Sequence, residues 1–512
     1  MKNIGTSRFC FCHYKTNMNR VNGRLLRTRI PRGFRRYSQY NYQYQQYQQY
    51  QPPRTSWTKR ILYTGIGLAG FGSYVYYFWW PKHTFPSSVA KILRKGLWAE
   101  SDKGENDYQL ALKYYLEAIN HCHEIEVDPL SDEYTGIQLK VGEMFERLDM
   151  LEDAAFVYNE IATLYLKVLT ATPNSEDGKR VRSRDHRAHL IQKDLRLAIK
   201  LVELNKANAQ LSKAILMTHL LIAQDEVHKK LGPNGNISRL TPNTSGSDYK
   251  ATIDSTSIEI SNDGITTTIN KNPSAWEPFV DEFFNAMDLL TAICISTGDL
   301  AMASKVKISM TEWMLLADVE PHKVLLSQCN LASLLYLQAE EYESKEVAYR
   351  RKFFEDSGLN FDDYRNSSQE TLKDSDVLER LDKEIEEQQR NEYSSVIQNK
   401  EKCIELSIKS YESVLEFAKN LPQEIISNNN TINETVALAT YGLGVVNLHL
   451  AQYEKAERLL REARVRSKTC GYDDLILEIE RELSKLFKEK KSLEKGKRAN
   501  KGDIEMDIHM KK

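Results

Sequence analysis

Residues 141–161 read VGEMFERLDMLEDAAFVYNEI, and the spacing of small and large residues in this stretch decides the fold. The same spacing returns in residues 443–463 (LGVVNLHLAQYEKAERLLREA) and in residues 97–118 (LWAESDKGENDYQLALKYYLEA). In each stretch a small residue is followed twelve positions later by alanine, then by a large apolar residue and by an apolar residue. The matching positions are Gly142, Ala154, Tyr158 and Ile161; Ala99, Ala111, Tyr115 and Ala118; and Gly444, Ala456, Leu460 and Ala463.

This pattern resembles the tetratricopeptide repeat, a pair of helices that needs small residues where the helices cross and bulky ones beside them. A weaker copy runs from Leu290 to Met310, and a split copy combines Leu331–Leu335 with Ser407–Val414. Ala111 and Ala154 are 43 positions apart, more than the usual period of about 34, so the array is irregular. We therefore predict an all-α, tetratricopeptide-like helical array over residues 90–485, with neighbouring pairs stacked on each other.

The first 99 residues contain no aspartate or glutamate, and residues 1–36 contain ten lysines and arginines. An arginine-rich leader without acids is typical of a mitochondrial transit peptide. Arg35 and Arg36 precede Tyr37 and Ser38, as at a matrix processing site, so we predict a transit peptide over residues 1–37 with cleavage between Tyr37 and Ser38. Residues 38–60 are rich in Gln and Tyr, and this composition predicts a disordered matrix segment.

Residues 61–80 contain no ionisable Lys, Arg, Asp, Glu or His, and as a helix they would cover about 30 Å, the thickness of the hydrocarbon core. They predict a single transmembrane helix with aromatic residues at its far end. The excess of basic residues before this segment places the N-terminus in the matrix and the rest of the chain in the intermembrane space. Gly65, Ala69 and Ser73 recur every four residues and predict a face for close helix packing.

Two insertions interrupt the predicted array. Residues 232–272 are rich in Gly, Asn, Ser and Thr, and alternating Ile and Thr around Asn262-Asp263-Gly264 predict a small β-hairpin. Residues 340–400 are heavily charged, which fits either an extended helix or a solvated loop. From residue 486 to 512 the chain is rich in Lys and Glu, and we expect a charged, flexible tail.

Composition argues against several classes of function. Beyond residue 90 the chain has 56 basic and 71 acidic residues, a balance of −15, which argues against nucleic-acid binding. The seven cysteines form no C-x-x-C, and neither His121-Cys122-His123 nor His186 with His189 completes a set of metal ligands. Phosphate-binding and nucleophile motifs are absent too. We therefore expect no metal, no cofactor and no enzymatic activity.

In a tetratricopeptide array the first helix of each pair lines a groove that binds partners. Here that helix carries Leu139, Glu143 and Glu146 in one repeat and Tyr441, Val445 and Leu448 in the last. An apolar groove with an acidic rim suits hydrophobic or basic peptide segments. The alternative is that these residues only pack inside the array.

Several long blocks carry a more specific resemblance. They are LWAESDKGENDYQLALKYYLEAI, DPLSDEYTGIQLKVGEMFERLDMLEDA, NPSAWEPFVDEFFNAMDLLTA, TEWMLLADVEPHKVLLSQCNLASLLYLQAE and TYGLGVVNLHLAQYEKAERLL. They resemble the fungal mitochondrial inner-membrane adaptor subunit of the i-AAA protease supercomplex. The resemblance implies a single-pass inner-membrane protein without catalytic residues. It also implies three kinds of partner, namely the i-AAA protease hexamer, a second small inner-membrane adaptor subunit and unfolded protein substrates.

The function expected from these features is that of a non-catalytic adaptor, which binds unfolded or misassembled membrane proteins and promotes their delivery for degradation. One alternative is a scaffold or assembly factor for inner-membrane complexes without substrate recognition. A second is a type II membrane protein of the secretory pathway, in which the N-x-S/T sites at Asn236, Asn243, Asn366, Asn429 and Asn433 would be glycosylated.

Overall fold

The structure is a computed structural model that describes residues 67, 70–74, 85–232, 250–253, 257–262, 265–356 and 387–494. The chain divides into two compact units, Met1–Lys82 and His83–Lys512, and the helical array belongs to the second. The predicted transit peptide and Gln/Tyr-rich segment lie outside the described residues, as do most of the predicted span at 61–80 and the chain beyond residue 494. None of the described helices combines the length and the apolarity needed to cross a bilayer.

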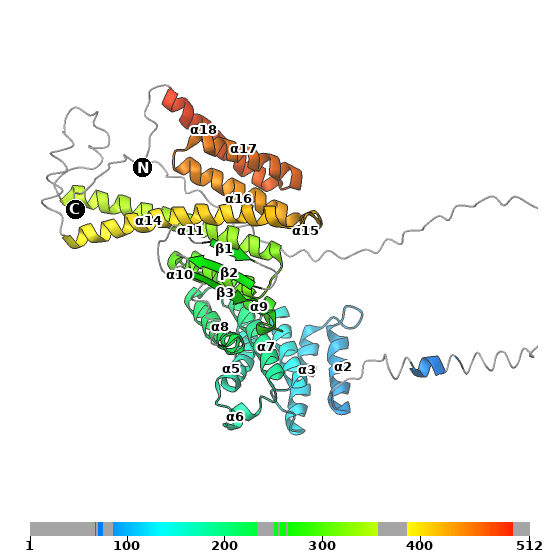
Figure 1. Ribbon diagram of the computed structural model, residues 1–512. Helices are drawn as coiled ribbons and strands as arrows, with labels where there is room; N and C mark the ends of the chain where they lie inside the picture. Colours follow the sequence, from blue (N-terminus) through cyan, green and yellow to red (C-terminus); the bar gives the residue numbers. More distant parts are fainter. Residues whose placement is uncertain are drawn as a thin grey trace, which may run out of the picture. The chain divides into compact units, whose positions relative to one another are not determined.

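Helix pairs follow one another along the second unit, and each pair packs against the next (Figure 1). Short connections contain α6 (Glu176–Lys179), the 3₁₀ turn η2 (Pro273–Ala275) and α15 (Gln423–Asn428), and α18 (Asp473–Glu494) packs on α17 after the last pair. The pairs are α2 (Ser87–Glu100) with α3 (Tyr108–Glu124), α4 (Asp132–Arg147) with α5 (Leu151–Thr170), α7 (Arg184–Leu204) with α8 (Ala209–Leu231), α9 (Val280–Ser296) with α10 (Leu300–Leu316), α11 (Pro321–Asp356) with α14 (Glu387–Asn420), and α16 (Asn430–His449) with α17 (Tyr453–Cys470). The described helices therefore form the predicted all-α array of paired helices.

The repeated small residues lie where the helices cross. A Cβ atom on Gly142 would stand 2.5 Å from Cε1 of Tyr158, so only glycine lets α4 rest on this ring. Gly444 meets Leu460 in the same way, with 2.8 Å between the ideal Cβ and Cδ2. In the first pair the residue against Tyr115 is Gly96, at 2.8 Å, one helical turn before the Ala99 that the spacing indicated. At each crossing, one helix has no side chain, and a large buried side chain of the other helix fills the space.

The weaker copies of the pattern also correspond to helix pairs. In α9 and α10, Ala303 and Met310 are fully buried. In α11 and α14, the Ser407 hydroxyl donates to the carbonyl of Ala332 at 2.8 Å and ties the two helices together. The pair α7–α8 was not recognised in the sequence, because a polar residue, His219, occupies its third buried position.

An aromatic cluster fills the middle of the array between α8, η2, α9 and α10. Trp276, Phe279 and Phe283 are completely buried, and the ring of Phe283 stacks on that of Trp313 with 5.3 Å between centroids. The core runs continuously from α5 to α11. A second buried cluster joins α2, α3 and α4.

The first insertion contains three strands, β1 (Lys250–Ile253), β2 (Ser257–Asn262) and β3 (Ile265–Asn270), which form one antiparallel sheet in the order β1-β2-β3. Asn262 lies opposite Ile265, and Ile258 lies opposite Ile269. The residues chosen for a hairpin by their alternation therefore belong to β2 and β3, whereas β1 was not expected. Asp263 and Gly264, the expected turn residues, lie outside the described residues.

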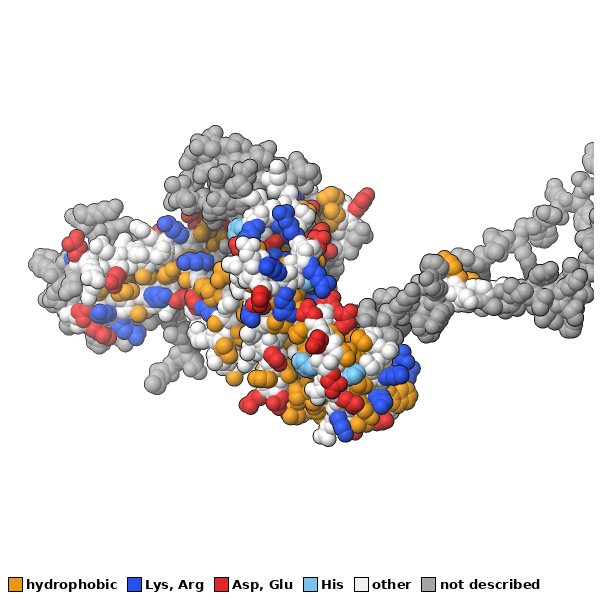
Figure 2. All heavy atoms as spheres, turned by 90° about the horizontal axis from the view of Figure 1, so that it is seen from below, with side chains coloured by type: hydrophobic (Ala, Val, Ile, Leu, Met, Phe, Trp, Pro, Cys, Tyr) orange, Lys and Arg blue, Asp and Glu red, His pale blue; other side chains and the backbone are white. Residues whose placement is uncertain are grey.

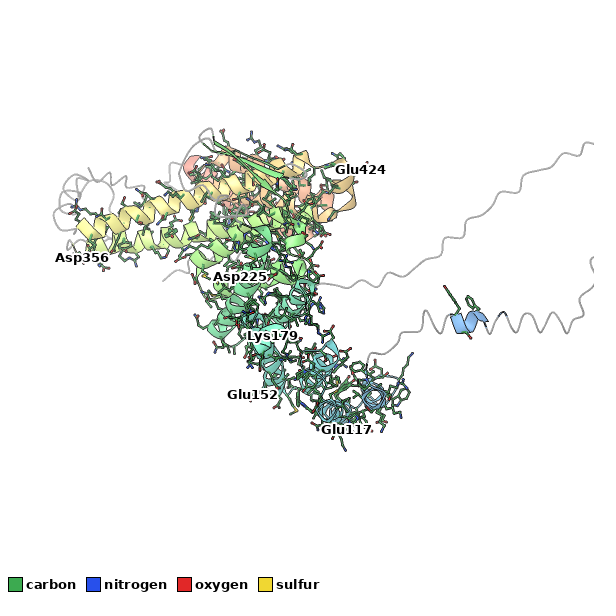
Figure 3. All side chains as sticks on the ribbon, turned by 60° about the horizontal axis from the view of Figure 1, so that its bottom comes forward. Glu117, Glu152, Lys179, Asp225, Asp356 and Glu424 are labelled. Atoms are coloured by element: carbon green, nitrogen blue, oxygen red, sulfur yellow. The ribbon has the colours of Figure 1, made fainter. Side chains whose placement is uncertain are left out.

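The charged insertion extends two helices of the array. Residues 340–356 continue α11 and residues 387–400 belong to α14, so the described parts are helix and not loop. The two helices run side by side as an arm, with Asp356 at its far end (Figure 3). Glu346, almost fully buried, pairs with Arg350 and with Lys400 across the arm. The last helix, α18, continues to Glu494, past residue 485 where the repeat domain was expected to end. Leu486, just beyond that expected boundary, is buried.

Candidate partner-binding surface

A network of ion pairs, which we call the charge ladder, connects the first helices of the first three pairs. The Glu100 carboxylate at the end of α2 accepts a hydrogen bond from the Tyr115 hydroxyl at 2.7 Å and one from Lys140 Nζ on α4 at 3.0 Å. On α4, Glu143 pairs at 2.8 Å with both Lys140 and Arg147. Alternating charges thus run along the exposed side of α4 and reach α2.

Glu146 extends the ladder to the next pair. Its carboxylate accepts the Tyr158 hydroxyl of α5 at 2.6 Å and pairs with Lys200 of α7 at 2.9 Å. Lys200 in turn lies 3.7 Å from Glu203 on its own helix. Glu146 of α4 therefore bonds to both α5 and α7, and Lys200 already balances its charge.

The partners of these groups decide their protonation. Burial raises the pKa of the Glu143 carboxyl, but hydrogen bonds from Lys140 and Arg147 outweigh burial, so its pKa lies below the usual range. Burial, together with a hydrogen bond to a neighbouring carboxylate, raises the pKa of both Tyr115 and Tyr158, which stay protonated donors. The Glu143 carboxylate and its partners Lys140 and Arg147, whose pKa values are raised, are therefore charged and paired near neutral pH.

The first half of the predicted groove coincides with this ladder. Leu139 is 40% exposed on α4, so its side chain is accessible, and its assignment to the groove stays a prediction. Glu143 and Glu146 are engaged with Lys140, Arg147 and Lys200, so a basic partner would have to compete with these cations.

The second half of the predicted groove is less accessible. Tyr441, Val445 and Leu448 on α16 are each less than a tenth exposed. Burial raises the pKa of Tyr441, and the carboxylates of Glu482 and Glu478 on α18 add to the effect. Here α18 contacts α16, so these three side chains offer little surface to a partner. Their assignment to a binding groove stays a prediction.

Sequence reasoning did not find a set of polar pairs, each with at least one buried member, in the middle of the array. His219 Nδ1 lies 2.7 Å from the fully buried Asp194 carboxylate, whose pKa is raised by burial although the imidazole opposes this shift. Lys307 is 3% exposed and bonds Asp288 at 2.5 Å. It stands four residues after Ala303, where the other repeats carry a large apolar residue, and this substitution in the pattern was the available signal.

Arg187 makes the third of these pairs. Its Nε donates to the Glu226 carboxylate at 2.8 Å, and a terminal nitrogen donates to the Leu169 carbonyl at 2.9 Å. Arg187 therefore joins α7, α8 and the end of α5.

The histidines and cysteines considered as metal ligands are separated in space or paired otherwise. His123 Nε2 lies 2.8 Å from the Tyr134 hydroxyl, His121 pairs with Glu124, and Cys122 is buried. His186 Nδ1 accepts the backbone N–H of Arg182 at 3.2 Å. Within the part of the chain that the structure describes, no three His, Cys, Asp or Glu side chains gather as a metal site.

The remaining predicted site residues belong to the first unit. Tyr37 and Ser38, the predicted processing site, lie outside the described residues, and so do Gly65 and Ala69 of the predicted packing face. Ser73 lies in the short helical stretch 70–74 and is exposed. These assignments stay predictions.

Comparison with known proteins gives a consistent set of relatives. The family model of the MGR3 middle domain matches residues 173–319, which contain α6 to α10. In Saccharomyces cerevisiae, the mitochondrial inner membrane i-AAA protease supercomplex subunit MGR3 is 34% identical over 450 residues, which cover 83% of this chain and 82% of the relative. The yeast protein MRG3-like is 30% identical over 449 residues, which cover 85% of this chain and 89% of the relative.

Among solved structures, the tetratricopeptide domain of P58(IPK) is 13% identical and matches 78% of this chain and 99% of its own. Its TM-score is 0.15, so the description of the fold depends on the helix pairs themselves.

Proposed function

The chain belongs to the family of the mitochondrial inner membrane i-AAA protease supercomplex subunit MGR3, and on that premise we propose that it is a non-catalytic adaptor of this protease. The observation that carries the proposal is the kinship itself, which extends over 450 residues and most of both chains. The array of helix pairs is in keeping with it, because stacked pairs offer extended surfaces for protein partners.

The proposed substrates are unfolded or misassembled membrane proteins, which the adaptor would bind and hand to the protease. Leu139 is the predicted groove residue that is most open to such a segment. Holding a weak site beside the protease makes the second encounter intramolecular and raises the effective concentration of substrate without tight contacts. A second small inner-membrane subunit completes the proposed assembly.

The proposed location is the inner membrane, with one span at residues 61–80, the N-terminus in the matrix and the helical array in the intermembrane space. Support comes from the acid-free, basic leader and from the uncharged segment that follows it. After rupture of the outer membrane, added protease should then digest the array. Protection of the array would contradict this orientation.

Association with the protease is tested by expressing the chain in yeast that lacks MGR3 and the MRG3-like protein. After detergent solubilisation and affinity purification, we expect the i-AAA protease to co-elute with this chain. Absence of the protease from the eluate, with the chain itself intact and membrane-bound, would refute the proposed function.

Substrate recognition needs a separate test, since a scaffold would also bind the protease. Leu139→Glu should slow turnover of an unfolded inner-membrane substrate while protease co-elution persists. Leu477→Glu is a matched control, because Leu477 is 64% exposed on α18, outside the predicted groove. Equal turnover in the Leu139→Glu variant and the wild type would favour the scaffold function.

A further inference from the structure

The helices α2 and α3 form an end of the array, where α4 is the described helix that makes an extensive contact with them. End repeats of helical arrays normally carry a polar outer face, because nothing else shields them from water. Here a hollow of 750 Å³ is lined by Ile92 of α2 and by residues of α3, among which Leu112 and Leu116 lie beside polar and charged side chains. Trp98 is 58% exposed and Leu97 is 52% exposed at the end of α2. Two large apolar side chains are therefore exposed at this end of the array.

One side of α2 combines these apolar residues with positive charge. Lys91, Arg94, Lys95 and Trp98 are spaced by three, four and seven residues, so they share one helix face, and all four are exposed. We call these residues, with Leu97 beside them, the α2 face. Figure 2 shows basic and hydrophobic side chains together at the right-hand edge of the helical array, the side on which α2 lies in Figure 1.

No carboxylate neutralises the α2 face from its own helix. Glu100 is the sole acidic residue of α2, and its side chain is 12% exposed because it pairs with Lys140 and accepts the Tyr115 hydroxyl. Glu117 and Glu124 on α3 lie at the hollow instead. An anionic partner surface would therefore be attracted by α2 and repelled by the outer side of α3.

Chain length limits where α2 can lie. Residues 81–86 separate the predicted span, 61–80, from the first residue of α2, Ser87. Even fully extended, this linker reaches about 20 Å. The interfacial layer on each side of the hydrocarbon core is about 5–8 Å thick. A chain anchored at residues 61–80 thus keeps the start of α2 within reach of the lipid head groups.

We propose that the α2 face binds the anionic surface of the membrane in which the chain is anchored. Lysine and arginine bind lipid phosphates, and a tryptophan ring with its N–H suits the boundary between head groups and acyl chains. The contact fixes the first helix pair on the membrane and so orients the array above it. This inference depends on the predicted span and not on the protease, so it can fail while the proposed function holds.

The test uses the full chain reconstituted in vesicles. One preparation is pure phosphatidylcholine, and the other contains about one-fifth anionic phosphatidylglycerol. Flotation first establishes that the chain is anchored in both. Reaction of Lys91 and Lys95 with an amine-specific reagent and oxidative labelling of Trp98 are then followed by mass spectrometry. We expect anionic lipid to lower the three labelling rates several-fold, and salt at about 1 M to restore them.

Variants separate the α2 face from general surface charge. Lys91→Glu with Arg94→Glu should abolish the protection of Trp98, because each cation near an anionic surface contributes about fivefold in affinity. Lys402→Glu with Lys409→Glu is the matched control, since both lysines are exposed on α14. The control variant should keep the protection of Trp98. An unchanged thermal unfolding curve verifies that both variants fold.

Three outcomes would overturn the proposal. The first is equal labelling of the α2 face in the two kinds of vesicle. The second is slower labelling that appears only after another protein is added and does not depend on the lipid composition. That result would make the α2 face a protein interface. The third is failure of the chain to float with either kind of vesicle, since the face would then bind lipid neither alone nor beside an anchor.

Discussion

Replacing Gly142 by alanine tests whether the helix crossing described here supports the array. The new Cβ would lie 2.5 Å from Tyr158 Cε1 and 2.6 Å from Cζ, so the ring or the helix must move. Tyr158 is 4% exposed, and its hydroxyl is held by Glu146 at 2.6 Å, which leaves the ring little freedom. Overpacking of this kind costs about 1–3 kcal/mol, and a displaced hydroxyl would add about 1.5–3 kcal/mol for the lost bond to a carboxylate.

Alanine also favours helix over glycine by about 1 kcal/mol, which opposes these losses. With the Tyr158 hydroxyl displaced, we therefore expect Gly142→Ala to destabilise the array by about 1.5–5 kcal/mol. Gly136→Ala on the same helix is the matched control, because its Cβ would meet nothing within 4 Å. That substitution should stabilise the protein by about 0.5–1 kcal/mol.

The assay is urea unfolding followed by circular dichroism, combined with amide hydrogen exchange of residues 151–170. Exchange is needed because stacked repeats can unfold in parts, so one midpoint can hide a local effect. In Gly142→Ala the midpoint should fall and α5 should exchange faster, whereas Gly136→Ala should shift the midpoint upward. If both variants shift the midpoint in the same direction by the same amount, glycine at position 142 does not serve the crossing.

Three further predictions use the same unfolding measurement. Arg187→Met should destabilise the protein by about 3–5 kcal/mol, because it leaves the Glu226 carboxylate buried without its cation, whereas Lys229→Met at an exposed pair should change stability by less than about 1 kcal/mol. Burial raises the pKa of Glu312 from 4.5 to about 7. Its contribution to the free energy of unfolding is therefore fully present below pH 4.5 and is lost as pH rises through 7. Glu312→Gln should accordingly stabilise the protein by about 2 kcal/mol near pH 8 and leave it unchanged near pH 4. Gly471→Ala should cost about 1–2 kcal/mol, because Gly471 has a φ of +74° after α17, and equal midpoints would show that this turn adapts.

The repeat pattern could be recognised in the sequence wherever the loops inside different helix pairs have the same length. Residues 148–150 connect α4 to α5, and residues 450–452 connect α16 to α17, so the crossing glycine stands twelve positions before the alanine in both pairs. The loop between α2 and α3 is longer, residues 101–107, and the contact with Tyr115 moves from Ala99 to Gly96. Spacing alone thus locates a crossing only while loop length is constant.

Other features could not be predicted because they depend on contacts between distant parts of the chain. Leu139 and Tyr441 both stand three positions before a crossing glycine, yet Leu139 is exposed and Tyr441 is buried, because α18 packs on α16 from beyond the last repeat. The engagement of Glu146 by Lys200 joins residues 54 positions apart on neighbouring pairs. A carboxylate on a helix looks identical in sequence whether it faces water or a cation from the next pair.

Polar pairs hold together the two helices of each of two neighbouring pairs in the middle of the array. The pairs Arg187–Glu226, Asp194–His219 and Lys307–Asp288 all lie within residues 173–319, the region matched by the family model. Alanine, leucine and tyrosine faces are alike from pair to pair, so apolar packing discriminates poorly between correct and shifted stacking. Separating Arg187 from the buried Glu226 carboxylate leaves a charge without its partner, at a cost of about 3–5 kcal/mol. Arg187–Glu226 and Asp194–His219 therefore oppose separation of α7 from α8, and Lys307–Asp288 opposes separation of α10 from α9.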